Sequence, residues 1–560
     1  MKKRLYIALF IITNLFGLES YAQSIPVGMS FFDDYYRRAQ LLGEYDSTAS
    51  FTNRPIFQTS SSGGDIFDPD STMFWDRTTN FDGLMTFGKE KGRIQLLPVS
   101  IINQINSHHP DGINDGAMIP AKGFQTLISA GFFVKYGPLS IQLKPEYVYA
   151  KNLPFDGYPQ DYTNSEGVKF PSSPYSGIDF PERFGTEPYS RVFWGQSSIR
   201  LNVGLMSLGV SNENLWWGPG YRNTLLMTNS APGFKHLTLN TSRPIKTWIG
   251  SFEGQLIAGK LEGSGYTENL RDDWRYINAM VLSYNPKWIP GLFLGATRSF
   301  LIYNEDMGNK IGDYLPVFSF LEKSGGGTNA EVNAQGQNQL ISVFMRWLFP
   351  EAHGEIYFEY GREDHAWDTR DLILDAAHSS AYLVGFRKLV VLNKQKETYM
   401  QIIAETTNLG PKQTTINRNG TYNTAVASNW YTHSQIRHGY TNEGQILGAG
   451  IGPGSILQTL DLSWVRSLKQ VGIQMERYVH NNDFWYNKIQ DFRSNWVDIS
   501  TMLYANWDYK NVLLSVKLKY IRSRNYEWIY EPEFTDPPVY FAPSKNTHNF
   551  HGQLGIMYRF

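Results

Sequence analysis

The sequence predicts a transmembrane, antiparallel β-barrel of about 18 strands, an even number being expected for a single bacterial chain. The clearest sign is the chain end, His551–Phe560, where apolar and polar side chains alternate and the last residue is aromatic. The same period of two recurs at 139–149, 248–256 and 512–520, with charged side chains on one face of each segment. A dry core excludes such charges, whereas a watered lumen accepts them. Totals of about 16 or 20 strands also fit, because boundaries read from sequence shift by several residues.

The N-terminus has the pattern of an export signal. Lys2, Lys3 and Arg4 precede an apolar run, Leu5–Leu18, and Ser20-Tyr21-Ala22 offers small residues for cleavage. The run is shorter than the roughly 20 residues that a membrane-spanning helix needs. We therefore expect residues 1–22 to be a removed signal peptide. After export, the chain would be inserted into outer-membrane lipid, with the barrel assembly machinery as its partner.

Residues 23–90 are expected to form a periplasmic helical and loop segment, and residues 91–560 the barrel. One convincing helix runs from Phe31 to Leu42. Ser30 is its expected N-cap, with Asp33 at capping-box spacing, and Gly43 ends it. Because this helix follows the signal peptide, it should lie on the periplasmic side or plug the lumen.

The connections between strands alternate in length, as expected for short periplasmic turns and long outer loops. Short turns are expected at Gly137-Pro138, Ser242–Pro244, Pro350-Glu351, Ser467–Lys469 and Asp508–Lys510. Long loops are expected at 151–190, 303–338, 407–443, 481–495 and 523–548.

Composition narrows the function classes. Cysteine is absent, so no disulfide, thiolate metal site or thiol nucleophile exists, and the net charge of −1 provides no basic field for nucleic acid. Aromatic residues make up 15% of the chain. That excess suits the aromatic girdles of a barrel, a sugar-binding surface, or a large soluble all-β enzyme.

Catalytic templates are missing: neither a His-Glu-x-x-His nor a Gly-x-Ser-x-Gly motif occurs. Carboxylates cluster at Glu363, Asp364, Asp368, Asp371 and Asp375, and a carboxylate pair can hydrolyse glycosides. A solvated loop is the favoured interpretation, because nothing in the sequence fixes the separation of two carboxylates. We expect no enzyme, no catalytic residue, no metal and no cofactor.

Two segments depart from strand patterning and are candidate polysaccharide-binding sites. In the first, tandem tryptophans lie beside polar residues and a Gly-Pro-Gly turn. Its candidate residues are Glu213, Asn214, Trp216, Trp217, Tyr221, Arg222 and Asn223. The aromatic faces would stack on sugar rings, and the polar groups would bind hydroxyls or uronic carboxylates. An inward-folded plug, or girdle tryptophans, is the structural alternative.

The second segment is glycine-rich and suits a tight inward bend. Its candidate residues, His438, Tyr440 and Asn442, would line a polar pocket. The structural alternative is a transition from loop to strand in which glycine allows close backbone approach.

These segments resemble the Wzi-type capsule assembly family of outer-membrane proteins. The resemblance rests on Glu213–Gly220, on His438–Asn442 with Ile451–Ser455 downstream, and on Asn114–Gly123. It implies a large barrel with periplasmic N-terminal helices, a largely occluded lumen, and a lectin-like role at the cell surface. The sequence departs from the family at the N-terminus, where one helix stands in place of a helical bundle.

The expected function is therefore that of a monomeric outer-membrane protein that binds and organises exported capsular polysaccharide. The alternative is a porin or substrate-specific channel, which the same barrel pattern would fit. An outer-membrane glycan hydrolase is a further alternative and would need two converging carboxylates.

Overall fold

The computed structural model describes residues 23–57, 65–71, 73, 84–89, 91–159, 174–175, 177–318, 336–363, 379–411, 430–489, 492–529 and 545–560. The expected signal peptide lies outside these residues and stays a prediction. So does the carboxylate cluster, apart from Glu363. No helix in these ranges is long and apolar enough to span a membrane.

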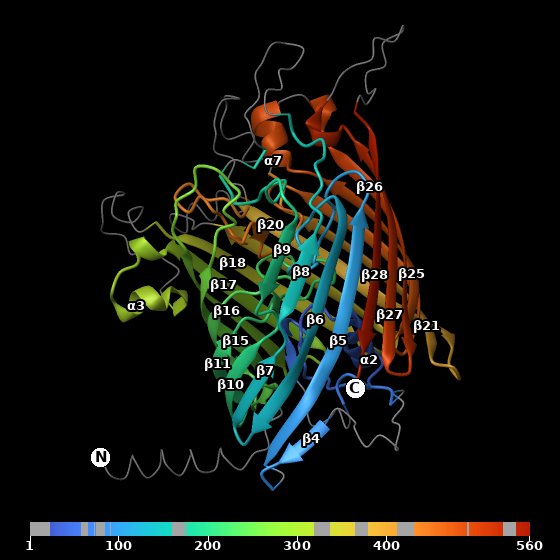
Figure 1. Ribbon diagram of the computed structural model, residues 1–560. Helices are drawn as coiled ribbons and strands as arrows, with labels where there is room; N and C mark the ends of the chain where they lie inside the picture. The colour runs from blue at the N-terminus through green and yellow to red at the C-terminus, as the bar shows by residue number, and fades with distance from the viewer. Residues whose placement is uncertain are drawn as a thin grey trace.

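The chain forms a closed antiparallel barrel of 18 spanning strands, which confirms the predicted fold (Figure 1). The strands, in chain order, are β5 (Gly92–Asn106), β6 (Gly123–Tyr136), β7 (Leu139–Leu143) with β8 (Glu146–Ala150), β9 (Tyr189–Phe193) with β10 (Ser198–Val203), β11 (Met206–Ser211), β13 (His236–Thr241) with β14 (Ile245–Lys246), β15 (Gly250–Leu261), β16 (Arg275–Pro286), β17 (Leu292–Tyr303), β18 (Asn338–Phe349), β19 (Gly354–Glu363), β20 (Ser380–Asn393), β21 (Thr398–Asn408), β24 (Ile456–Arg466), β25 (Lys469–Val479), β26 (Val497–Tyr509), β27 (Val512–Arg524) and β28 (Thr547–Tyr558).

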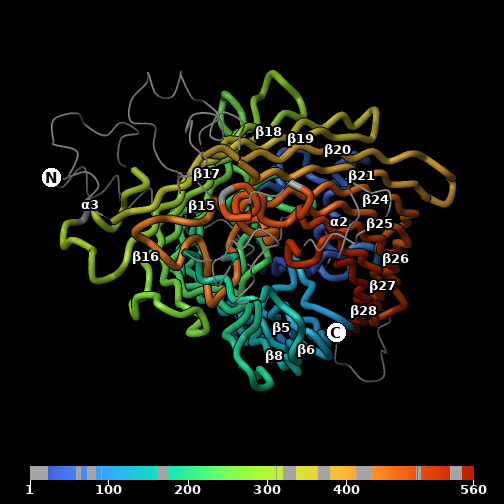
Figure 2. The backbone as a smooth tube through the Cα atoms, turned by 90° about the horizontal axis from the view of Figure 1, so that it is seen from above, coloured from blue at the N-terminus to red at the C-terminus, as the bar shows by residue number. Residues whose placement is uncertain are grey.

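The barrel closes between its last and first spanning strands, β28 and β5, as Figure 2 shows. Their register runs from Tyr558 opposite Val99 to His551 opposite Asn106. Closure pairs the backbone groups that an open sheet edge would leave unsatisfied in hydrocarbon. Strand β4 (Leu84–Phe87) pairs with the start of β5, beside the spanning strands. The predicted terminal strand is thus the strand that seals the barrel.

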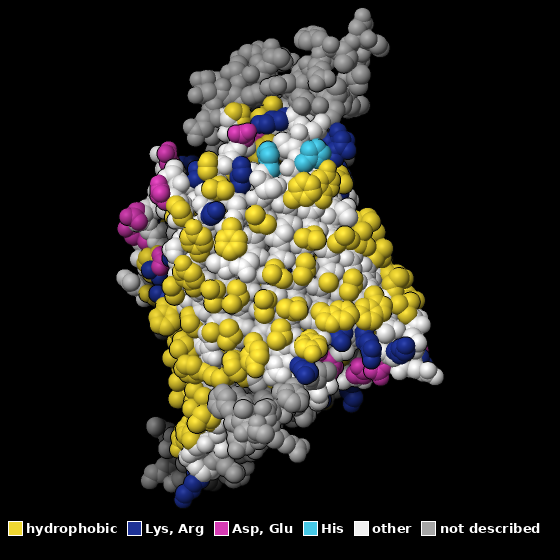
Figure 3. All heavy atoms as spheres, turned by 45° about the vertical axis from the view of Figure 1, so that its right-hand side comes forward, with side chains coloured by type: hydrophobic (Ala, Val, Ile, Leu, Met, Phe, Trp, Pro, Cys, Tyr) yellow, Lys and Arg dark blue, Asp and Glu magenta, His cyan; other side chains and the backbone are white. Residues whose placement is uncertain are grey.

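Side chains alternate between the outer and inner faces as the sequence pattern predicts. In β27, Leu514, Val516 and Leu518 are exposed on the outside, while Lys517 and Lys519 point inward. The outer surface carries a broad field of hydrophobic side chains over the strands, with charged side chains gathered towards the two ends of the face in view (Figure 3). This arrangement suits lipid outside and water or protein inside.

Short turns and long loops lie at opposite ends of the barrel, as predicted. The end with short turns includes those at Gly137-Pro138 and Pro350-Glu351. The other end carries the long connections that follow β8, β17, β21, β25 and β27. Short helices α3 (Ile311–Tyr314) and α7 (Asn482–Phe484) belong to these connections.

Helix α2 (Ser30–Leu41) lies inside the barrel. Phe32, Tyr36 and Ala39 on one face are buried, and Asp34 and Arg37 on another face are buried too, because the wall surrounds the helix. Ser30 was predicted as the N-cap, and that prediction is wrong. The N-cap is Met29, and no side chain caps the helix.

Charged contacts attach α2 to the barrel wall. The Nε of Arg37 lies 2.7 Å from Oε1 of Glu355 on β19, and Arg346 on β18 donates to Oε2 of the same carboxylate at 2.7 Å. Arg387 on β20 lies 3.0 Å from Asp34 of the helix. Two pairs of short strands also involve the N-terminal segment. Strand β1 (Ser24–Ile25) pairs with β3 (Ile56–Phe57) within this segment, and β2 (Asn53–Arg54) pairs with β12 (Trp216–Trp217), which lies far along the chain.

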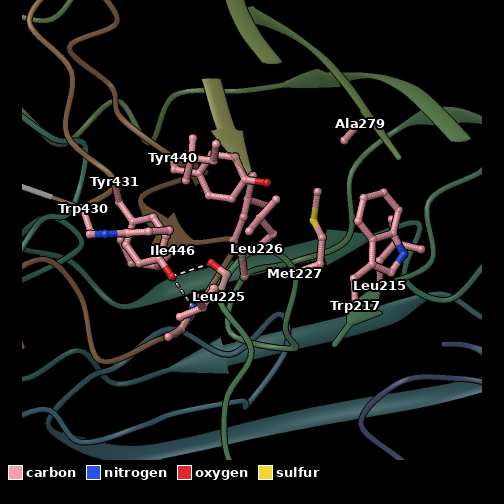
Figure 4. Packing of buried hydrophobic residues seen from close by; sticks show 14 of the residues in the cluster. Leu215, Trp217, Leu225, Leu226, Met227, Ala279, Trp430, Tyr431, Tyr440 and Ile446 are labelled. Atoms are coloured by element: carbon pink, nitrogen blue, oxygen red, sulfur yellow. Dashed lines mark hydrogen bonds between the residues drawn. The ribbon is translucent and has the colours of Figure 1, made fainter. Parts of the chain in front are cut away.

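Two inward-folded segments fill the lumen nearer the loop end. We call residues 212–234 the first inward segment and residues 430–455 the second, which contains β22 (Thr441–Asn442) and β23 (Gln445–Ile446). Leu225 and Met227 of the first pack with Tyr431 and Tyr440 of the second (Figure 4). The hydroxyl of Tyr431 donates to the carbonyl of Leu225 at 2.6 Å. The lumen therefore contains an apolar core rather than an open channel.

Candidate functional site

The polar start of the first inward segment is held by buried hydrogen bonds. Glu213 is fully buried and lies 2.6 Å from Arg200 on β10, and Ser24 and Ser211 donate to it at 2.8 and 3.0 Å. Burial by itself raises the pKa of Glu213, but Arg200 and the two hydroxyls hold it below the ordinary 4.5. Glu213 thus connects the segment to the wall as a charged carboxylate.

Replacing Glu213 with Gln should lower the free energy of unfolding by about 2 kcal/mol at neutral pH, because hydrogen bonds to a charged group are lost. A carboxylate whose pKa is lowered in the folded state stabilises that state above its unfolded pKa, and this stabilisation is lost as the pH falls through the folded pKa. The variant and the wild type should therefore converge below the ordinary value of 4.5. Thermal unfolding, followed as loss of the heat-modifiable folded band at neutral pH and below pH 4.5, measures the difference in stability between the variant and the wild type. A difference in stability as large at acidic pH as at neutral pH would contradict the prediction.

The turn after the tryptophans surrounds a carboxylate on the wall. The backbone amides of Tyr221 and Asn223 donate to Glu405 of β21 at 2.6 and 2.9 Å, and the Arg222 amide also donates to it at 3.1 Å. The Gly218-Pro219-Gly220 turn makes this approach possible, because a Cβ at Gly220 would lie 1.8 Å from the carbonyl oxygen of Asn223. These contacts hold the middle of the first inward segment against β21.

The two tryptophans have different surroundings. Trp217 is completely buried in the apolar core, and its indole N–H donates to Gln255 at 3.1 Å (Figure 4). Trp216 faces a cavity, and the guanidinium of Arg54 lies 5.1 Å from its ring centre. Within the described residues the indole N–H of Trp216 has no hydrogen-bond partner. Trp216 is thus the better placed of the two to meet a ligand.

This cavity, which we call the lumenal chamber, has a volume of about 200 Å³ and lies between α2 and the first inward segment. Three of the predicted site residues line it: Trp216, Tyr221 and Arg222. Glu213, Asn214 and Asn223 do not line it. Asn214 is buried and donates to Asn229 at 2.9 Å.

The second predicted group lies apart from the chamber. Tyr440 is buried and stacks on Tyr431, with ring centres 5.8 Å apart. His438 is paired with the hydroxyl of Tyr303 at 2.8 Å, and burial lowers the pKa of its imidazole to about 4. Asn442 accepts from the amide of Glu262 at 3.0 Å. Tyr440 packs against the first inward segment in the apolar core, and Asn442 donates to the carbonyl of Pro232 in that segment at 3.1 Å, but none of the three residues lines the lumenal chamber. A binding role for all ten predicted residues stays a prediction.

A second cavity, of about 140 Å³, lies at the loop end of the barrel, and we call it the aromatic pocket. Its walls come mainly from loops that follow six different spanning strands. The aromatic lining residues are Phe155, Tyr175, Phe180, Tyr478, Trp496 and Tyr526, with His109 and His480 beside them. His480 stacks on Trp496 at 3.6 Å between ring centres, and its Nε2 lies 2.8 Å from Asp498. These contacts make a rigid base to the pocket.

Carboxylates provide the polar part of the aromatic pocket. Burial raises the pKa of Glu182 to about 7, and burial with the nearby Glu182 charge raises the pKa of Glu527. Glu182 can therefore donate as well as accept hydrogen bonds near neutral pH. Asn525, Glu527 and Trp528 have left-handed backbone conformations, with φ of 49°, 56° and 55°. Such strain in non-glycine residues is concentrated at binding sites.

Within the described residues no group of three or more His, Cys, Asp or Glu side chains is placed to hold a metal ion. Stacking faces and hydrogen-bonding carboxyl groups together suit the apolar C–H surface and the hydroxyls of a sugar ring. The sequence pattern missed this pocket, because its residues are spread from His109 to Glu527 with no shared motif.

Fold and cavities together define a transmembrane β-barrel that is blocked by its own chain and carries an aromatic pocket at the loop end. The model of the family described as capsule assembly protein Wzi matches residues 108–527. The chain belongs to this family and is an outer-membrane barrel.

One solved structure supports the fold, and two others are similar over most of their length. Wzi of Escherichia coli, described as a carbohydrate-binding β-barrel involved in group 1 capsule assembly, is 13% identical, with a TM-score of 0.56 and coverage of 96% of this chain and 100% of that one. OccAB2 of Acinetobacter baumannii is 9% identical, with a TM-score of 0.37 and coverage of 82% and 97%. OccK7 of Pseudomonas aeruginosa is 8% identical, with a TM-score of 0.38 and coverage of 83% and 98%. No curated protein sequence matches the chain.

Proposed function

We propose that this protein retains exported capsular polysaccharide at the cell surface by binding its sugar units in the aromatic pocket. The observation that carries the proposal is the pocket itself, which lies among the long loops of a capsule-assembly barrel. Half-buried Tyr175, Phe180 and Tyr478 offer stacking faces, and Glu182 and Asp111 offer hydrogen-bonding groups at the same opening. This is the combination that a lectin site uses.

The plugged lumen favours binding over transport. The apolar core between the two inward segments, with buried Trp217, Tyr431 and Leu225, fills part of the lumen. A porin would need a continuous polar channel. Planar-bilayer recording of the purified protein separates the two functions: we expect no steady open-channel conductance, and a robust conductance would favour the porin.

Loss of the protein should shift polysaccharide from the cell-bound to the released fraction while total export stays unchanged, because a lectin retains polymer without making it. The measurement compares polysaccharide in washed cells and in the medium for wild-type and deletion strains. An unchanged cell-bound fraction in the deletion strain would remove the retention role.

A further inference from the structure

The lumenal chamber is separate from the aromatic pocket and is built from other elements. Its walls are α2, the first inward segment and the inner faces of β20, β25, β26 and β27. The side chain of Ile113 lines both cavities, so the loop after β5 forms the partition between them. Gly28 and Ser30 line the chamber and are solvent-exposed, which means that water reaches it.

Cationic groups predominate in this chamber. Arg37, Arg54, Arg222, Arg387 and Lys517 line it, against two carboxylates, Asp33 and Asp34. Two of these arginines form ion pairs with carboxylates of the barrel strands: Arg37 lies 2.7 Å from Glu355 on β19, and Arg222 lies 2.8 Å from Glu476 on β25. Asp33 and Asp34 lie 3.8 and 3.0 Å from Arg54 and Arg387. Lys517 has no ion pair within the described part of the chain, so the chamber keeps an excess of positive charge.

Several buried donors in the chamber make no hydrogen bond of good geometry with the described residues, although Asp34 lies 3.0 Å from Arg387. Arg387 is 1% exposed, and none of its three guanidinium nitrogens makes a hydrogen bond of good geometry with the described residues. The same is true there of Nη2 of Arg37 and of the indole N–H of Trp216. A buried donor without a hydrogen-bond partner destabilises the folded protein, so a ligand that accepts a hydrogen bond from it is favoured. The first turn of α2 adds a helix N-terminus at Ser30, which also favours an anion.

The remaining wall is polar but uncharged and suits hydroxyl groups. Tyr221, Gln470, Gln474, Tyr504 and Asn506 line it. At about 200 Å³ the chamber is smaller than the roughly 300–1,000 Å³ of pockets for drug-sized ligands, a size that suits one sugar unit.

We propose that the lumenal chamber is a second binding site, which takes one acidic sugar unit with its carboxylate between Lys517, Arg387 and the indole N–H of Trp216. Tyr221 and the amide side chains of the wall would bind the ring hydroxyls. This site does not depend on retention of polymer in the aromatic pocket, so either site can fail without the other.

Calorimetric titration of the purified, folded full-length protein with D-glucuronate tests the proposal, with D-glucose and inorganic phosphate as comparison ligands. Lys517→Gln should weaken glucuronate binding about tenfold, the loss expected for one charge-assisted hydrogen bond. Trp216→Phe, which removes the indole N–H and keeps an aromatic ring, should weaken it several-fold. Lys388→Gln changes a neighbouring cation on the outer side of β20 and should leave binding unchanged.

Saturable glucuronate binding that is at least about tenfold tighter than glucose binding, and weaker in both chamber variants, would support the site. Three results would overturn it: no saturable binding of glucuronate, equal binding of glucose, or phosphate binding as tight as that of glucuronate. Unchanged affinity in both folded chamber variants would overturn it as well. Substitutions in the aromatic pocket should leave glucuronate binding intact, which separates failure of this site from failure of polysaccharide retention.

Discussion

Replacing Glu355 with Gln should lower the free energy of unfolding by about 3–5 kcal/mol, the cost of leaving buried cations without their partner. Its carboxylate is completely buried, lies within 2.7 Å of Arg37 and Arg346, and lies 3.6 Å from Arg387. These arginines belong to α2, β18 and β20, so one carboxylate joins the internal helix to two strands. Gln keeps the shape and removes the charge, which leaves three guanidinium groups facing one another.

Urea titration of the heat-modifiable folded band measures this effect. Glu351→Gln, in the exposed turn just before β19, is the matched control and should change stability by less than about 0.5 kcal/mol. If Glu355→Gln were as stable as the control, the charged attachment of α2 would not hold the plug in place.

The double change of Tyr175→Ala and Phe180→Ala should reduce the cell-bound fraction of polysaccharide almost to the level of the deletion strain. The two rings meet edge to face, with centres 5.0 Å apart, in the wall of the aromatic pocket. Each lost aromatic contact is worth about 0.5–1.5 kcal/mol beyond area burial, so together they should weaken sugar binding roughly fivefold to a hundredfold.

Trp248→Ala is the matched control for this experiment. Trp248 is 83% exposed in the short turn between β14 and β15, at the end of the barrel opposite the long loops. Its removal takes away an aromatic side chain of larger size but leaves the aromatic pocket untouched, so retention should stay at the wild-type level. Equal retention by the double variant and the control, with both proteins folded in the membrane, would exclude the aromatic pocket.

The barrel could be predicted from sequence because side chains of a strand between lipid and a polar interior face the two environments in turn, so that apolar and polar residues alternate. Leu514 and Lys517 in β27, like Leu139 and Gln142 in β7, face the sides that the pattern predicts. Loop lengths were predictable as well, because successive strand patterns are separated alternately by few and by many residues. The helix N-cap was not predicted correctly, because the helix already includes Ser30, its N-cap is Met29, and no side chain caps it.

The candidate site was only partly predictable. For the tryptophan segment, the structural alternative of an inward-folded plug matches the observed fold, and Trp216, Tyr221 and Arg222 meet at the lumenal chamber. The sequence does not show which tryptophan keeps an open face, because Gln255 on a distant strand binds Trp217. The aromatic pocket left no local signal, since its side chains meet only when the loops after separate strands converge.

Equilibrium binding of polysaccharide to the purified barrel tests the central claim most directly. The polymer would be purified from the medium of the deletion strain and titrated into the folded, detergent-solubilised wild-type protein and into the Tyr175→Ala/Phe180→Ala variant. We predict saturable binding to the wild type that weakens at least about fivefold in the double variant. Absence of saturable binding to the folded wild-type protein would contradict the account.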